Sequence, residues 1–236
     1  MNTGMMVDSQ NQLHESGKQR FPDYPFLLKM PAKLISYFFH PVFIPVYVVM
    51  FSVYVHPYLF TGFDAIQKMR IVMMAAVSFT FFPLITVLLL KALKFIDSIY
   101  LHTQKERIIP IIACMTWYFW VWYVWNNFGK TNDAIDIPKP IIQFAFATFV
   151  STVITLMVNI KMKVSLHAIS MGIMITFLFL MAFTQDINFG IWLSVALLIT
   201  GLVSTARFIV SDHTSQEVYG GLLLGIVSMM IGYFVA

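Results

Sequence analysis

This chain of 236 residues has few charged side chains: Asp, Glu, Lys and Arg make up 11% of it, whereas hydrophobic residues make up 59%. A soluble domain carries about a quarter charged residues, so this composition excludes an ordinary soluble protein. The apolar residues gather in runs close to the roughly 20 residues that cross a bilayer as a helix. The sequence therefore predicts an integral membrane protein, an all-α polytopic bundle of transmembrane helices with six to seven spans.

Three other features that the sequence lacks exclude further classes of protein. The single cysteine, Cys114, excludes an internal disulfide, and the lack of short segments with alternating hydrophobicity argues against a membrane β-barrel. Residues 1–33 lack the apolar core of a cleavable signal, and we interpret them as a polar lead-in that is disordered or lies on the membrane surface. Residues 34–236 form the transmembrane helical domain, with spans expected at 34–60, 71–93, 108–126, 141–160, 168–183, 189–210 and 214–236.

Three polar connections, 97–107, 161–167 and 211–213, are each separated from the next by two expected spans. Because successive spans alternate in direction, all three should lie on one face of the membrane. Arginine forks, a hydroxyl and lysines suit a tetrahedral oxyanion such as phosphate, and two histidines can provide one group to attack and another to transfer a proton. The residues that this face would collect are Arg107, Arg207, His167, His213, Ser165, Glu217, Lys105, Lys161 and Lys163.

The stretch 207–217 combines a cation, an imidazole and a carboxylate at regular spacing. If the chain is helical from Thr214 onward, His213 and Glu217 lie four residues apart on one face. The carboxylate can then bind one ring nitrogen and leave the other free, which is the arrangement of a nucleophilic or basic histidine. The same residues would also suit a capped turn between two membrane helices, and spacing alone does not separate the two interpretations.

This stretch resembles the third signature block, Ser-Arg-x5-His-x3-Asp, of the type-2 phosphatidic acid phosphatase and vanadium haloperoxidase superfamily. Arg207, His213 and Glu217 match its spacing. Ala206 stands where the family has Ser, and Glu217 stands where it has Asp, which keeps the charge and adds a methylene. The resemblance covers roughly residue 97 to the C-terminus.

The other two blocks of the family occur in the expected order. The second, Pro-Ser-Gly-His, is matched by Ser165 and His167 without the flanking Pro and Gly. The first, Lys-x6-Arg-Pro, is matched by Arg107, whereas Pro110 comes three residues later and Tyr100 occupies the position of the lysine. The number of membrane spans places the chain on the lipid phosphatase side of this superfamily.

The resemblance implies that His213 attacks phosphorus to form a phosphohistidine, that Glu217 orients His213, and that His167 protonates the leaving alkoxide and then activates water. It needs no metal and no cofactor. The implied substrate is a lipid phosphate or diphosphate, such as an isoprenoid-diphosphate carrier, phosphatidic acid or phosphatidylglycerophosphate. The expected partners are this lipid and the bilayer, with no nucleic acid. The phosphoryl oxygens would be held by Arg107, Ser165 and Arg207, with Lys105 or Lys163 replacing the family lysine.

Three other functions are alternatives. The departures in the first block keep open a catalytically inactive member that binds lipid. A small transporter with a proton-coupled His/Glu pair would need ionisable residues deep within the spans, and the expected spans hold few. A metal site built from His167, His213 and Glu217 lacks a short ligand pair such as His-x3-His.

Two arguments about which side of the membrane the site faces lead to opposite answers. By the expected spans, 11 of the 15 Lys and Arg residues lie on the site face, and the positive-inside rule then places this face in the cytoplasm. Bacterial relatives of the family commonly act on the outer face. We expect the inner membrane of a bacterial cell, with the charge count favouring a cytoplasmic site.

Overall fold

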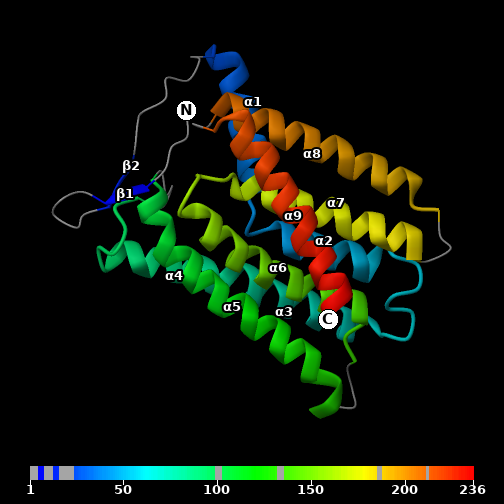
Figure 1. Ribbon diagram of the computed structural model, residues 1–236. Helices are drawn as coiled ribbons and strands as arrows, with labels where there is room; N and C mark the ends of the chain where they lie inside the picture. The colour runs from blue at the N-terminus through cyan, green and yellow to red at the C-terminus, as the bar shows by residue number, and fades with distance from the viewer. Residues whose placement is uncertain are drawn as a thin grey trace.

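The computed structural model describes residues 5–7, 13–15, 24–98, 103–131, 136–184, 188–210 and 213–236. The first two stretches form a short antiparallel hairpin of β1 (Met5–Val7) and β2 (Leu13–Glu15). The other regular elements in these ranges are helical (Figure 1). They are α1 (Phe26–Phe38), α2 (Ile44–Tyr54), α3 (Ala65–Ala75), the π-helical turn η1 (Ala76–Phe81), α4 (Phe82–Ala92), α5 (Gln104–Thr131), α6 (Lys139–Asn159), α7 (Leu166–Thr184), α8 (Gly190–Val210) and α9 (Ser215–Val235).

Six of the described helices are long and apolar enough to cross a membrane. They are the continuous helix Ala65–Ala92, made of α3, η1 and α4, followed by α5, α6, α7, α8 and α9. The wide turn η1 ends two residues before Pro83, which has no N–H and cannot continue regular α-helical hydrogen bonding. The prediction of an integral membrane protein with a polytopic helical bundle is confirmed.

The expected first span, 34–60, is two separate helices instead of one. Helix α1 ends at Phe38 and α2 begins at Ile44, with Pro41 in the turn between them. A proline disfavours helical backbone at the residue before it, which explains the break. Helix α1 also begins at Phe26, inside the stretch expected to be a polar lead-in, and neither α1 nor α2 is among the six long helices.

Helices α7 and α9 pack against each other along a line of glycines, which we call the α7–α9 seam and define by Gly172, Gly221 and Gly225. A Cβ atom added to Gly225 would collide with the carbonyl oxygen of Ile169 and lie 2.9 Å from the Cα of Gly172. Small residues allow two membrane helices to approach to backbone contact. The seam therefore holds the first turns of α7 and α9 in a defined relation.

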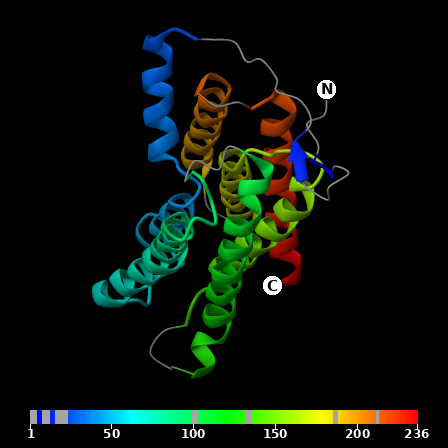
Figure 2. The same ribbon diagram turned by 90° about the vertical axis from the view of Figure 1, so that its left-hand side faces the viewer.

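Helix α1 stands at the edge of the bundle and packs against α8 (Figure 2). Most of its large apolar side chains remain exposed, among them Leu27 at 84% and Leu34 at 62%. The first turns of α5, α7 and α9 and the last turn of α8 lie at the upper end of the bundle in Figure 2. The three chemically rich stretches of the sequence therefore lie at one end of the bundle.

Candidate functional site

Backbone and side-chain hydrogen bonds join the three stretches that the sequence singles out. On α5, the Nη1 atom of Arg107 donates to the carbonyl oxygen of Val164 at 2.9 Å. The N–H of the next residue, Ser165, donates to the carbonyl oxygen of Glu217 on α9 at 3.1 Å. The starts of α5, α7 and α9 are thus bonded to one another through residues that flank or belong to the candidate site.

The His213–Glu217 pair has the geometry that the spacing predicts. The Nδ1 atom of His213 lies 2.7 Å from Oε2 of Glu217. The same oxygen accepts from the backbone N–H of Thr214 at 3.2 Å, and Thr214 caps α9 in return by accepting from the N–H of Glu217 at 3.3 Å. The capped turn and the oriented histidine are therefore not alternatives, because one carboxylate serves both.

His213 is held as a neutral imidazole. Only 5% of its surface is exposed. Burial, followed by the charges of Arg107, Arg207 and Lys163, holds the pKa of His213 well below its ordinary value of 6.5. In the neutral ring, Nδ1–H donates to Glu217, so Nε2 carries the lone pair. A buried imidazole with one bonded nitrogen and one basic nitrogen suits nucleophilic attack.

The cations around His213 come from three different elements. Arg107 lies in the first turn of α5, Arg207 in the last turn of α8, and Lys163 in the connection before α7. Arg107 is 7% exposed, and a guanidinium group this deeply buried suits planar recognition of an anion. These three cations form what we call the cationic cluster, which consists of Arg107, Lys163 and Arg207 and acts on the neutral imidazole of His213.

His167 lies beside the cluster but its Nε2 atom points at helix α1. This atom is 3.0 Å from the carbonyl oxygen of Ser36. A carbonyl oxygen only accepts, so Nε2 carries the proton and donates, and Nδ1 of the neutral ring holds the lone pair. The expected acid–base group is therefore bonded to α1 in this structure.

His40 is a member of the site that sequence reasoning missed. Its ring meets the ring of His167 edge-on, with centroids 5.3 Å apart. Burial, and then the charge of Arg207, lowers the pKa of His40 to about 4 from 6.5. Its Nδ1 atom accepts weakly from the N–H of Val42 at 3.4 Å. No spacing within the chain pointed to His40, because its neighbours lie on distant helices.

The structure also describes Ser165 and Lys105, two further residues that the sequence predicts for the site. Ser165 is fully buried, and its hydroxyl oxygen accepts from the N–H of Ala168 at 3.4 Å, as a helix cap does. Lys105 is exposed and lies two residues before Arg107, so it is on another face of α5. Tyr100 lies outside the described residues, and so do residues 211 and 212 of the turn before His213.

Two further observations bear on what the site can hold. Among the residues that the structure describes, no three His, Cys, Asp or Glu side chains come close enough together to bind a metal ion. The chemistry available there is that of imidazoles, a carboxylate and cations, which suits an anionic ligand. Comparisons with protein-family models, with curated proteins and with solved structures found no match to the chain.

Proposed function

We propose that the protein is an integral membrane phosphatase that hydrolyses a lipid phosphate or lipid diphosphate through a phosphohistidine on His213. The observation that carries this proposal is the buried His213–Glu217 pair at 2.7 Å, with Arg107, Arg207 and Lys163 acting on the same imidazole. A neutral nucleophile beside three cations matches what displacement at a phosphate needs. The position of this cluster at helix ends suits a lipid headgroup at the membrane interface.

The first step is attack by Nε2 of His213 on phosphorus. A P–N bond forms while the P–O bond to the lipid alcohol, or to the remaining lipid phosphate, breaks. Glu217 stabilises the positive charge that the imidazole acquires, as the carboxylate of a catalytic triad does. In the second step water attacks phosphorus, the P–N bond breaks, inorganic phosphate leaves and His213 is regenerated.

His167 is the group expected to protonate the leaving oxygen and to deprotonate the water. Its Nε2–H donates to Ser36, so in this arrangement proton transfer would use Nδ1, or Nε2 after α1 moves away. The same bond favours a second candidate function: a membrane protein that binds a phosphate headgroup without turning it over. The two functions differ in whether phosphate is released.

The deciding experiment measures inorganic phosphate released by purified protein from phosphatidic acid, phosphatidylglycerophosphate and an isoprenoid diphosphate. We expect His213→Gln to abolish release and His167→Gln to reduce it by about 10²–10⁴-fold, the usual contribution of acid–base catalysis. Arg70→Ala, which removes an exposed arginine on α3, is the control and should retain full activity. The phosphatase proposal fails if wild type releases no phosphate from any substrate, and the nucleophile is misassigned if His213→Gln remains active.

The facing of the site is a separate part of the proposal. We place the protein in the inner membrane of a bacterial cell with the site toward the cytoplasm, because the Lys and Arg count favours that side. New single cysteines between residues 127 and 140, in a Cys114→Ser background, should then react with an impermeant thiol reagent added to intact cells. Protection of these cysteines would reverse the orientation.

A further inference from the structure

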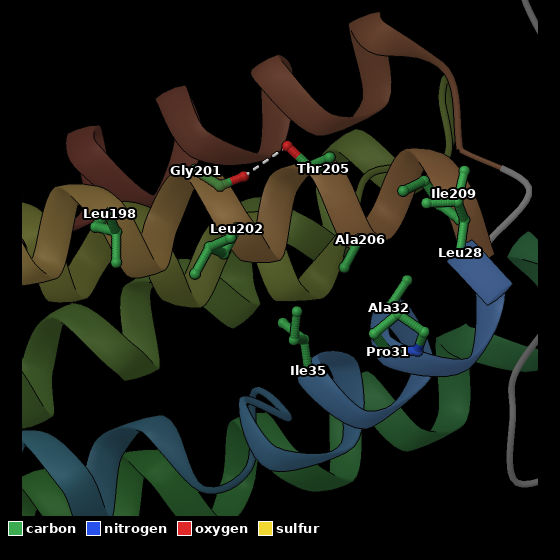
Figure 3. A pocket seen from close by; sticks show the side chains of 10 residues that line it. All are labelled: Leu28, Pro31, Ala32, Ile35, Leu198, Gly201, Leu202, Thr205, Ala206 and Ile209. Carbon is green, nitrogen blue, oxygen red and sulfur yellow. Dashed lines mark hydrogen bonds between the residues drawn. The ribbon is translucent and has the colours of Figure 1, made fainter.

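An apolar groove runs between α1 and α8 and opens at the edge of the bundle (Figure 3). Its volume is about 380 Å³, which lies within the range of small-molecule pockets. Leu28, Ala32 and Ile35 line it from α1, and Leu198 and Gly201 are among the residues that line it from α8. Its surface is almost entirely hydrocarbon, so an occupant must be apolar.

The length of the groove corresponds to one leaflet of a bilayer. On α8 it extends from Leu198 to Ile209, and at a rise of 1.5 Å per residue these 11 steps span about 16 Å. The hydrocarbon core of a bilayer is about 30 Å thick. A groove of this length suits one extended lipid chain that descends from the interface to the bilayer centre.

Both walls of the groove are continuous with the candidate site. On α8, the lining residue Ala206 is followed directly by Arg207 of the cationic cluster. On α1, the lining residue Ile35 is followed by Ser36, whose carbonyl oxygen accepts from His167. A lipid chain lying in the groove would therefore have its headgroup beside the phosphate-binding cations.

We propose that the α1–α8 groove binds a hydrocarbon chain of the same lipid whose phosphate lies at the cationic cluster. The groove makes the enzyme select lipid phosphates over water-soluble phosphate esters, and it rests on the proposed function for the identity of the headgroup. Gly201 is one of the residues that line the groove, and a Cβ atom added there would meet nothing within 4 Å. We expect a large side chain at this position to extend into the space that the lipid chain would occupy.

The test compares Gly201→Phe with Gly62→Phe. Gly62 lies in the turn between α2 and α3, where an added Cβ likewise meets nothing within 4 Å, so it controls for a new exposed aromatic residue. We expect Gly201→Phe to raise the KM for long-chain phosphatidic acid about tenfold or more, an effect of the size expected when a hydrophobic pocket loses its fit. Hydrolysis of a phosphate ester with a short chain should be unchanged, and Gly62→Phe should behave as wild type.

A second measurement does not depend on turnover. Phosphatidic acid with a diazirine in the middle of one chain should label peptides of α1 and α8 in wild type, and about tenfold less in Gly201→Phe. Phosphatidylcholine with the same chain, whose headgroup is zwitterionic, should label them weakly. Equal labelling by both lipids, or labelling spread evenly over the lipid-facing helices, would overturn the inference, because the groove would then hold bulk lipid only.

The two proposals fail in different ways. If wild type releases no phosphate but phosphatidic acid labels the groove selectively, the phosphatase function is wrong and the groove is still a binding site for the hydrocarbon chain of a lipid. If wild type releases phosphate but Gly201→Phe changes neither KM nor labelling, the phosphatase function stands and the groove inference is wrong.

Discussion

Two pairs of helices, α7 with α9 and α1 with α8, lie next to the candidate site, and they are packed in opposite ways. In the α7–α9 seam the backbones touch, so that even a methyl group on Gly225 would collide with Ile169. Between α1 and α8 the helices leave a groove of about 380 Å³, and a side chain on Gly201 would meet open space. The same residue type, glycine, thus has opposite roles in the two contacts: at Gly225 it permits contact and at Gly201 it leaves room.

The tight and the loose helix contact lie beside different parts of the candidate site. The α7–α9 seam lies beneath the His213–Glu217 pair and beneath Ser165, so it fixes the groups that need an accurate geometry. The α1–α8 contact lies beside a lipid-facing opening and contributes His40 and the Ser36 carbonyl. Rigid packing under the His213–Glu217 pair and loose packing along the groove is the arrangement that the proposed phosphatase would need if its substrate enters from the bilayer.

Gly225→Ala should have the largest effect, because it tests whether the α7–α9 seam is as tight as its geometry implies. The atoms that the new methyl group would strike are backbone atoms and cannot rotate away. We expect a loss of more than about 3 kcal/mol of stability, seen as aggregated protein in size-exclusion chromatography after detergent extraction. Gly220→Ala on the same helix is the control, since its Cβ would lie 3.7 Å from the flexible end of Met162, an ordinary contact. Equal behaviour of the two variants would contradict the seam.

Glu217→Gln separates the catalytic role that we propose for this residue from its role in the helix cap. Glutamine can still complete a capping box, so the melting temperature should change little, whereas the stabilising charge on His213 is lost. We expect phosphate release to fall about 10³-fold or more. Asp64→Asn in the corresponding capping box of α3 is the control and should leave activity intact. If Glu217→Gln retains full activity, the carboxylate is a cap alone.

Lower pH should weaken the α1 side of the molecule through His40. The pKa of His40 is about 4 in the folded protein and 6.5 ordinarily, so the unfolded chain binds more protons between these values. Stability is therefore complete above about pH 6.5 and is lost as the pH falls toward 4, by up to roughly 3 kcal/mol. Protonation is disfavoured because the ring is partly buried beside Arg207 and His167. The measurement is the melting temperature in detergent from pH 7 to 4.

The comparison for this pH effect is His40→Gln, which cannot titrate. The difference in melting temperature between wild type and His40→Gln should shift against wild type as the pH falls. Parallel curves for the two proteins would show that His40 is accessible to water and not held in the site.

The sequence predicted the joining of the three polar stretches even though one expected span was wrong. The stretches near Arg107, Ser165 and His213 are separated only by α5 to α8, and these four spans were predicted in the right number and order, so the break between α1 and α2 did not affect the count. The His213–Glu217 bond was predictable because it is local, at four residues. Hydropathy predicts the order of the spans, and local periodicity predicts the His213–Glu217 contact.

Other features could not be read from the chain. The contact of His167 with Ser36 joins residues 131 positions apart, and nothing local marks either partner. The position of Lys105 depended on where α5 begins: an expected start at 108 left Lys105 in a connection, whereas the helix begins at Gln104 and turns it away from Arg107. The groove depends on the side-by-side placement of α1 and α8, which hydropathy does not determine.

The smallest effect is expected from Gly201→Ala, and its sign is the informative part. A methyl group at this position meets no atom within 4 Å, so it costs no contact, while alanine reduces the freedom of the unfolded chain and suits a helix better. We expect a gain of about 0.5–1 kcal/mol and a rise of about 2–4 °C per kcal/mol in melting temperature. Gly172→Ala in the α7–α9 seam is the opposed control and should be destabilising, because its methyl group would collide with the carbonyl oxygen of Leu222. A destabilising Gly201→Ala would mean that α1 and α8 close onto each other in the folded protein, and the space for a lipid chain would then be absent.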